Sequence, residues 1–211
     1  NLGTLAMLSQ LKTLAGRHVQ IVRGDHDDVT NPNFMKRMSG SSAPEGKLIM
    51  QSDMANQWEQ NANGFGPLFI DAQHAFESAQ PYAVTATSGS QNVGITHAVA
   101  APIPMEGGGT RNVTVDDLAE RNNNAWQAVM WERNATPESV GALFEAVGFG
   151  QQYPSIQIGA HTPVADGLYR EEANGVAITI NNPDNVILAV VPAHRSFVPA
   201  TDVVDLGNPY A

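Results

Sequence analysis

The chain has 211 residues, of which 42% are hydrophobic and 15% are charged, and its formal net charge is −10. This length and apolar fraction suffice for one sizeable core, so we predict a single domain over residues 1–211. The acidic balance argues against nucleic acid as a partner, because binding to a phosphate backbone requires a basic surface. The absence of cysteine excludes disulfides and thiolate ligands, and leaves His, Asp, Asn and Glu as possible metal ligands.

No stretch of the sequence approaches about 18 consecutive apolar residues, so we predict no membrane association and expect a cytoplasmic location. The sequence begins at Asn1 without the basic and apolar regions of a signal peptide. It also lacks an initiator Met, which suggests processing or truncation.

The beginning of the sequence predicts a helix that leads into a buried strand. Leucines recur at near-helical spacing before a glycine stop signal, at Leu5, Leu8, Leu11, Leu14 and Gly16. Residues 18–22 are typical of a short strand, which ends at the polar run 23–28. Open α/β sheets place their sites at the carboxyl ends of strands, so this run is a candidate site.

A hairpin is predicted in the middle of the chain, after a loop over residues 30–46 and a short helix over residues 53–61. Residues 82–87 and 93–97 read as strands on either side of Ser88–Gln91. The second strand would bring His97 to its end. A glycine-rich loop over residues 106–110 then breaks the pattern.

Two helices and three strands are predicted after this loop. Thr114, with acids in the following turn, indicates a helix start, and that helix is expected to reach about Arg133. Thr136, followed by Pro137, is a stronger start signal, and Gly148 closes the second helix. Strands are predicted over residues 155–158, 176–180 and 186–191, whereas Glu171 and Glu172 are interpreted as a solvated turn. This order of elements predicts a mixed α/β or layered α+β domain.

Three polar clusters each follow a predicted strand. They contain Arg23, Asp25 and His26 in the first cluster, His97 in the second and His161 in the third. Two imidazoles and a carboxylate from separate strand ends can converge on a first-row divalent ion such as Mn, Fe or Zn. An Arg recognises phosphate through its planar fork, and a neighbouring His can protonate a leaving oxygen near neutral pH. The residues alone therefore suggest metal-assisted phosphoester hydrolysis.

These clusters resemble the calcineurin-like metallophosphoesterases, in particular bacterial and phage serine/threonine phosphatases and their diadenosine-polyphosphate hydrolase relatives. The family motifs V-R-G-N-H-E/D, H-A/G, W-x-R and G-H-T-P correspond in order to 22–27, 97–98, 131–133 and 161–163. The resemblance covers essentially the whole chain, loosely between the motifs. It implies a mixed β-sandwich flanked by helices, of which this chain forms the carboxy-terminal two-thirds.

The resemblance also implies a ligand set for one metal. Asp25, His97 and His161 would bind the family's second metal, with Mn as the expected ion and Fe or Zn as alternatives. In such sites two metals polarise the phosphoryl oxygen and lower the pKa of a bridging water, which attacks in line.

By the same resemblance, three further residues act on the substrate. His26 would be the general acid toward the leaving group, and Arg23 and Arg133 would clamp the phosphate. The expected substrate is a phosphorylated protein or a small phosphoester.

The sequence departs from the family pattern in several places. The first metal requires D-x-H and G-D motifs, and no D-x-H occurs here, so we expect an upstream segment or another chain to complete the fold. Asp25 replaces the ligand Asn, Ala160 replaces the Gly before the His, and residues 181–183 replace D-T-G. A catalytically decayed phosphatase-fold protein, acting as a structural or binding subunit of a larger assembly, is therefore an alternative. Coincidental resemblance would leave only an acidic α/β protein.

Each candidate residue also has a plainer interpretation. Residues 25–28 are compatible with a solvated loop, and an isolated histidine such as His97 or His161 is more often hydrogen-bonded in a core or loop. Arg133 is compatible with a charge at a helix end. Trp126 and Trp131 are interpreted as core anchors. Only the ordered combination of motifs favours a site.

Overall fold

The computed structural model describes residues 2–24, 75–76, 78–149, 155–182 and 184–208. The chain divides into two compact units, Asn1–Pro81 and Tyr82–Ala211. The prediction of one domain over residues 1–211 stays a prediction. None of the described helices has the length and apolar character that a membrane crossing requires.

The first unit begins with α1, Leu2–Ala15, and a 3-10 turn, η1, Gly16–His18. The predicted helix and its glycine stop are confirmed, and Gly16 has a φ of +54°. The predicted loop at 30–46 and helix at 53–61 lie outside the described residues.

The strand predicted over residues 18–22 is wrong, because residues 19–24 join no sheet in the described part of the chain. Their backbone groups instead bond to other parts of the first unit. The Lys12 ammonium donates to the carbonyl oxygens of Gly16 and Val19 at 3.1 and 2.6 Å. The Arg23 amide donates to the Pro81 carbonyl at 3.1 Å. Residues with the sequence pattern of a strand thus form a segment that pairs with no other described strand.

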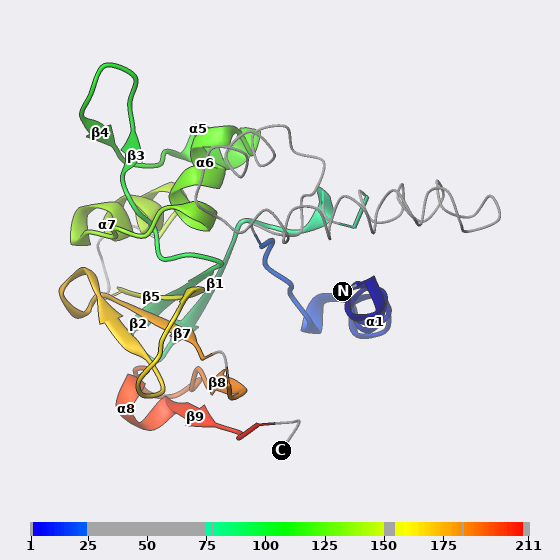
Figure 1. The fold of residues 1–211 in the computed structure, drawn as a ribbon. Helices are drawn as coiled ribbons and strands as arrows, with labels where there is room; N and C mark the ends of the chain where they lie inside the picture. The colour runs from blue at the N-terminus through cyan, green and yellow to red at the C-terminus, as the bar shows by residue number, and fades with distance from the viewer. Residues whose placement is uncertain (1, 25–74, 77, 150–154, 183, 209–211) are drawn as a thin grey trace. The chain divides into compact units, whose positions relative to one another are not determined.

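A five-stranded mixed sheet, in the order β1-β2-β5-β7-β6, forms the centre of the second unit (Figure 1). Its strands are β1 (Ala83–Ser88), β2 (Gln91–Thr96), β5 (Ser155–Pro163), β6 (Arg170–Glu172) and β7 (Ala177–Asn181). β2, β5 and β7 are parallel, and β1 and β6 pair antiparallel at the edges. The predicted α/β class is therefore confirmed as a mixed sheet flanked by helices.

The predicted hairpin is confirmed, since β1 and β2 pair antiparallel up to Ser88 and Gln91. Its turn needs a glycine, because Gly89 has a φ of +58° and a Cβ there would lie 2.7 Å from the Arg195 carbonyl carbon. The Ser88 hydroxyl donates to the carbonyl oxygens of Pro192 and Arg195 at 2.7 and 2.8 Å. The hairpin tip is thereby fixed to the carboxy-terminal segment, and His97 directly follows β2.

The connection from β2 to β5 contains helices. They are α5 (Val115–Glu120), α6 (Asn123–Trp126), a π-helical turn η2 (Gln127–Trp131) and α7 (Pro137–Ala146). Both predicted starts are confirmed, since Thr114 and Thr136 each form a capping box. The predicted closure at Gly148 is also confirmed by its φ of +85°.

The single helix predicted from Thr114 to about Arg133 is wrong. The chain enters the left-handed region at Arg121, with a φ of 51°. Asn122 then starts a new helix, because its side-chain oxygen accepts from the amides of Asn124 and Ala125 at 3.0 and 3.1 Å. An asparagine that caps a helix competes with continuation of the previous one.

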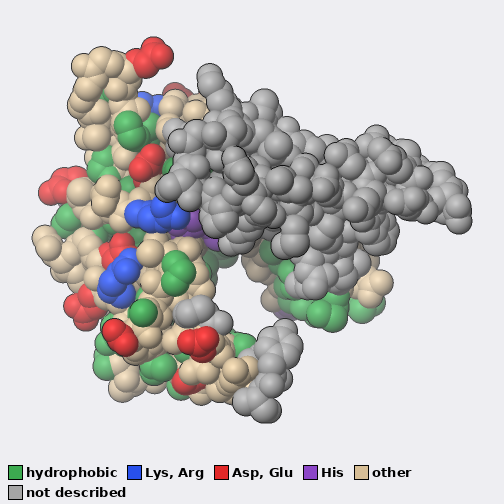
Figure 2. Space-filling view, in the orientation of Figure 1, with side chains coloured by type: hydrophobic (Ala, Val, Ile, Leu, Met, Phe, Trp, Pro, Cys, Tyr) green, Lys and Arg blue, Asp and Glu red, His purple; other side chains and the backbone are tan. Residues whose placement is uncertain are grey.

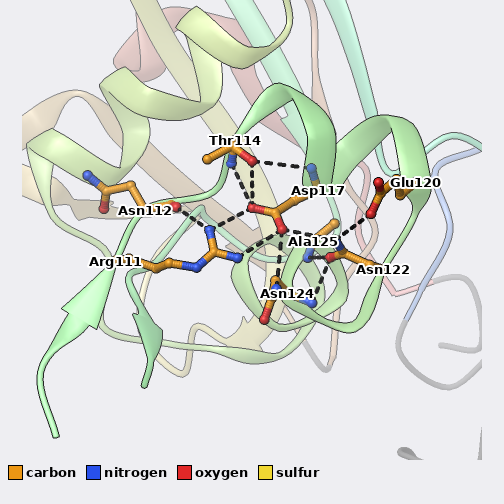
Figure 3. A network of polar contacts seen from close by, with 8 residues as sticks. All are labelled: Arg111, Asn112, Thr114, Asp117, Glu120, Asn122, Asn124 and Ala125. Atoms are coloured by element: carbon orange, nitrogen blue, oxygen red, sulfur yellow. Dashed lines mark hydrogen bonds and ion pairs between the residues drawn. The ribbon is translucent and has the colours of Figure 1, made fainter. Parts of the chain in front are cut away.

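A polar network around Asp117 holds this break in place (Figure 3). The buried carboxylate accepts from both terminal nitrogens of Arg111 at 2.7 and 2.9 Å. It also accepts from the amide and hydroxyl of Thr114 and from the side chains of Asn122 and Asn124. The Arg111 hydrogen bonds are the main reason that the pKa of Asp117 lies far below its usual range.

The two faces of the sheet carry different layers. Ile156, Ile158 and Ile178 pack against a carboxy-terminal ribbon, where Phe197 and Val203 complete the cluster. This ribbon consists of β8 (Ile187–Ala189), α8 (Pro199–Asp202) and β9 (Val203–Asp205), with β8 and β9 antiparallel. The strand predicted at 186–191 is thus found as β8, in a separate two-stranded sheet.

The opposite face of the sheet packs against α7. Val99 and Ala177 meet Val140 and Phe144 there. The Phe144 ring lies so close to the sheet that a Cβ on Gly94 would be 3.1 Å from it. Figure 1 shows α5–α7 on one side of the sheet and the β8–β9 ribbon on the other. The sheet is therefore covered on both faces, as parallel strands require.

Two short pairings were not predicted. Glu171 and Glu172 are not in a solvated turn, because β6 pairs antiparallel with β7 and Glu172 accepts from the Thr179 hydroxyl at 2.5 Å. The glycine-rich loop is the tip of a second hairpin, formed by β3 (Ile103–Pro104) and β4 (Thr110–Arg111). Pairings of two or three residues are too short to give a periodic signal.

We expect Asp117→Asn to lower the free energy of unfolding by about 2–4 kcal/mol, since it leaves the partners of a buried carboxylate incompletely paired. Urea denaturation at pH 7 measures this loss. Asp116→Asn is the matched control, because Asp116 lies exposed in the same helical turn and should change stability by less than about 0.5 kcal/mol. Equal losses in the two variants would contradict the role of the network.

The stability difference between the wild type and Asp117→Asn should depend on pH. The folded-state pKa of Asp117 is depressed, so its contribution to stability is present above the unfolded-state pKa of about 4. It is lost progressively as the pH falls below that value. The stability difference between wild type and Asp117→Asn should therefore be constant from pH 7 to about 5 and shrink at lower pH.

Candidate active site

His97 and His161 meet although 64 residues separate them in the sequence. The Nε2 atom of His97 lies 3.0 Å from the Nδ1 atom of His161, and the rings are edge to face with centroids 4.9 Å apart. Both rings are half-buried. The second and third predicted polar clusters thus form one site, at the carboxyl ends of two neighbouring parallel strands.

Backbone pairing between β2 and β5 brings the two histidines together. The regular register ends at Ile95 and Ile158. The Ala160 amide then donates to the His97 carbonyl at 2.8 Å, which extends the pairing beyond β2. On its other side β5 shifts register against β7 between Gly159 and Pro163. Such irregularities re-aim side chains next to sites, and this one includes His161.

Gly159 permits the close approach of the two backbones. A Cβ at this position would lie 2.7 Å from the amide nitrogen of Val99 and 3.0 Å from the carbonyl carbon of Ala98. Both neighbours are backbone atoms, which cannot move aside without changing the turn that follows His97. A side chain at residue 159 would therefore push the two histidine-bearing segments apart.

Gln157 fixes the turn that follows β2. This fully buried side chain accepts from the Ala100 amide at 3.0 Å and donates to the Thr96 hydroxyl at 2.5 Å. The Thr96 hydroxyl in turn donates to the Ala98 carbonyl at 2.5 Å. All polar atoms in this path are paired, as a buried network requires. The backbone on both sides of His97 is consequently held by β5.

The π-helical turn also supports this region. The Glu132 amide donates to the Gln127 carbonyl at 2.9 Å, five residues back. Carbonyls at the end of a helix lack internal donors. Here the Val129 carbonyl accepts from the Ala98 amide at 2.8 Å and the Ala128 carbonyl accepts from the Ala101 amide at 3.0 Å. The helix end is thereby bonded to the turn that carries His97.

Two tryptophans stack because of this π turn. Residues five apart in an α-helix point about 140° away from each other. The wider turn instead aligns Trp126 and Trp131, whose rings are stacked at 5.4 Å with an interplanar angle of 19°. π turns of this kind are frequent at functional sites. Trp126 is buried, as predicted for a core anchor, but Trp131 extends from the core toward the histidine pair.

Trp131 links the histidine pair to Arg133. Its ring centroid lies 6.1 Å from that of His161, and the Arg133 guanidinium carbon lies 5.8 Å from the Trp131 ring centroid. Arg133 is exposed. On the face shown in Figure 2, histidine atoms, in purple, lie beside a patch of Lys or Arg atoms, in blue. Three of the four sequence motifs therefore contribute to a single site.

The other predicted site residues do not belong to the group formed by the histidine pair, Trp131 and Arg133 in the described part of the chain. Asp25 and His26 lie outside the described residues. Arg23 belongs to the first unit, where it is buried and its amide bonds to Pro81. Within the described ranges, no group of three or more His, Asp or Glu side chains has the arrangement of a metal site.

The histidine pair fits two ligands of one metal ion. With metal–nitrogen bonds of about 2.1 Å, two ligand nitrogens lie about 3.0 Å apart at a right angle and about 3.4 Å apart at the tetrahedral angle. The observed separation of 3.0 Å between His97 Nε2 and His161 Nδ1 is compatible with such spacing, and it is equally an ordinary hydrogen-bond distance. Without a metal, the same two nitrogens form a hydrogen bond when one of them carries the proton.

Sequence reasoning missed two residues of this region. Trp131 was assigned to the core, although its place in the W-x-R motif was a signal for a position beside the site. Gln157 gave no signal, because a glutamine inside a strand pattern does not reveal whether it is buried.

Comparison of the chain with protein-family models, with curated proteins and with solved structures finds no match. The functional assignment therefore depends on the sequence motifs and on this geometry.

We expect Gly159→Ala to lower the free energy of unfolding by about 1–3 kcal/mol, because the added Cβ meets the backbone at Val99. Gly141→Ala is the matched control. Gly141 is exposed inside α7 with no atom within 4 Å of an added Cβ, so alanine should stabilise the protein by up to about 1 kcal/mol. Urea denaturation compares the two, and a stable Gly159→Ala protein would refute the close approach.

Proposed function

We propose that the chain is a metal-dependent phosphoester hydrolase with a site of the calcineurin-like metallophosphoesterase type. The observation that supports this proposal is the 3.0 Å approach of His97 and His161, next to Trp131 and Arg133. The motifs that these residues belong to are distant in sequence and adjacent in space. The mixed sheet agrees with the expected α/β class, and the histidine pair lies at the carboxyl ends of two of its parallel strands.

His97 and His161 would hold the metal together with Asp25. Imidazole and carboxylate ligands suit Mn, Fe or Zn, and Mn is the ion expected from the family resemblance. When bound, the metal would supply Lewis-acid polarisation of the phosphoryl oxygen. In this proposal His26 donates a proton to the leaving oxygen of the ester.

Arg133 and Arg23 would bind the phosphate. A guanidinium recognises two phosphate oxygens at once through its planar fork. Arg133 is exposed and lies over the Trp131 ring, which in turn lies next to His161. In a chain with a net charge of −10, a basic group at this position provides local attraction for an anionic ester. The proposed substrate is a phosphorylated protein or a small phosphoester.

A second candidate function is binding or assembly by a decayed phosphatase fold. One structural and one sequence observation favour it. His97 and His161 form a hydrogen bond with each other, so the pair is stable in the fold without a metal. Replacement of a family glycine by Ala160 is in agreement with a relaxed constraint at this site.

We expect the purified protein to contain a divalent metal and to hydrolyse p-nitrophenyl phosphate in a Mn-dependent reaction. His97→Ala should lose both properties, because it removes one of two adjacent ligands. His194→Ala, in which an exposed histidine outside the site is removed, should retain both. Elemental analysis and initial rates measure these outcomes. Absence of metal and turnover in the wild type would favour the binding function.

We expect Arg133→Ala to raise KM for p-nitrophenyl phosphate about tenfold, as the loss of a charge-assisted hydrogen bond would. Arg170→Ala is the matched control, since Arg170 is an exposed arginine paired with Glu172 on the edge strand β6. It removes the same charge from the chain without touching the site. If the two variants raised KM equally, Arg133 would act only through net charge.

A further inference from the structure

Trp131 contacts both kinds of functional group in the candidate site. Its indole lies beside the His161 ring at 6.1 Å with an interplanar angle of 44°. The Arg133 guanidinium lies over the same indole at 5.8 Å. One aromatic side chain thus connects a proposed metal ligand with a proposed phosphate-binding residue.

The position of Trp131 is set from the protein core. Its ring stacks on Trp126, which is 1% exposed. The π turn that aligns the two rings is bonded to the backbone at Ala98 and Ala101. An indole has only two side-chain torsions, so these contacts suffice to fix its orientation. The Trp126–Trp131 stack therefore forms a rigid support that reaches from the core to the site.

We propose that Trp131 is a positioning residue that orients the His161 imidazole and holds the Arg133 guanidinium toward the phosphate position. This inference rests on the proposed function of the site. An exposed arginine loses conformational entropy when it binds a ligand. Stacking on an aromatic ring already restricts the side chain in the free protein, so less entropy is lost on binding. A ligand ring is oriented by the groups that touch it outside the metal. Trp131 serves both purposes without touching the substrate.

Two substitutions separate this role from a purely structural one. Trp131→Leu removes the aromatic face, and Trp131→Phe retains a flat ring. With saturating Mn, we expect Trp131→Leu to raise KM for p-nitrophenyl phosphate by about two- to fivefold, with a smaller change in kcat. Trp131→Phe should restore most of the wild-type KM. A Trp131→Met variant serves the same comparison if the leucine variant does not fold.

A second readout does not depend on turnover. The ring C–H resonances of the histidines are recorded by two-dimensional NMR without added metal, and His97→Gln and His161→Gln variants assign the pair. Trp131→Leu should weaken the NOEs between the ring protons of His161 and His97, Trp131→Phe should retain them, and the His194 resonances should be unchanged. The unchanged His194 signal shows that the variants remain folded.

The two readouts distinguish failure of this inference from failure of the proposed function. If the wild-type protein neither binds metal nor hydrolyses the ester, the proposed function fails, and the NMR comparison still decides whether Trp131 orients His161. Unchanged NOEs between His97 and His161 in Trp131→Leu would overturn the inference. An active wild type with the same KM in Trp131→Leu would overturn it as well.

Discussion

The hydrogen bond from the Ala160 amide to the His97 carbonyl extends the β2–β5 pairing past its regular end, and the candidate site depends on this extension. It requires the close backbone approach that Gly159 permits. With the two segments in this register, His97 and His161 can only be neighbours. The rest of the described site follows from what surrounds this pairing, namely the Gln157 network beneath it and the π turn beside it.

Buried polar groups outside the site hold the connecting segments in a defined order. Asp117 and Arg111 fix the break between α5 and α6, from which the chain proceeds to the π turn. At the other end of the unit, Arg195 donates hydrogen bonds to the buried Asp202, which precedes β9. These bonds are the main reason that the pKa of Asp202 is lowered to about 2. Each pair joins a carboxylate with an arginine seven or fewer residues away. These local pairs define loops that hydrophobic packing alone would leave unspecified.

Much of the second unit could be predicted from its sequence, and the reasons are local. Thr114, Thr136 and the glycine at 148 give strong cap signals, and the alternation in residues 82–97 identifies the hairpin. The meeting of His97 and His161 followed from motif order together with the rule that parallel strands end at one edge. The π turn was not predictable, because its carbonyls find their partners elsewhere in the fold. The break at Arg121 depends instead on the Asn122 cap and the Asp117 network, which helical periodicity does not reveal. The strand predicted over residues 18–22 was wrong because an alternating pattern does not show whether another strand is present for it to pair with.

The proposed function requires that His97 and His161 act as adjacent ligands of a single divalent metal. Titration of the protein with Zn²⁺, followed through the histidine ring resonances by NMR, tests it most directly. We predict that one equivalent shifts the signals of both His97 and His161 and leaves His194 unchanged. Signals of the pair that stay unmoved through several equivalents would contradict the claim and leave the two residues as a hydrogen-bonded pair of the fold.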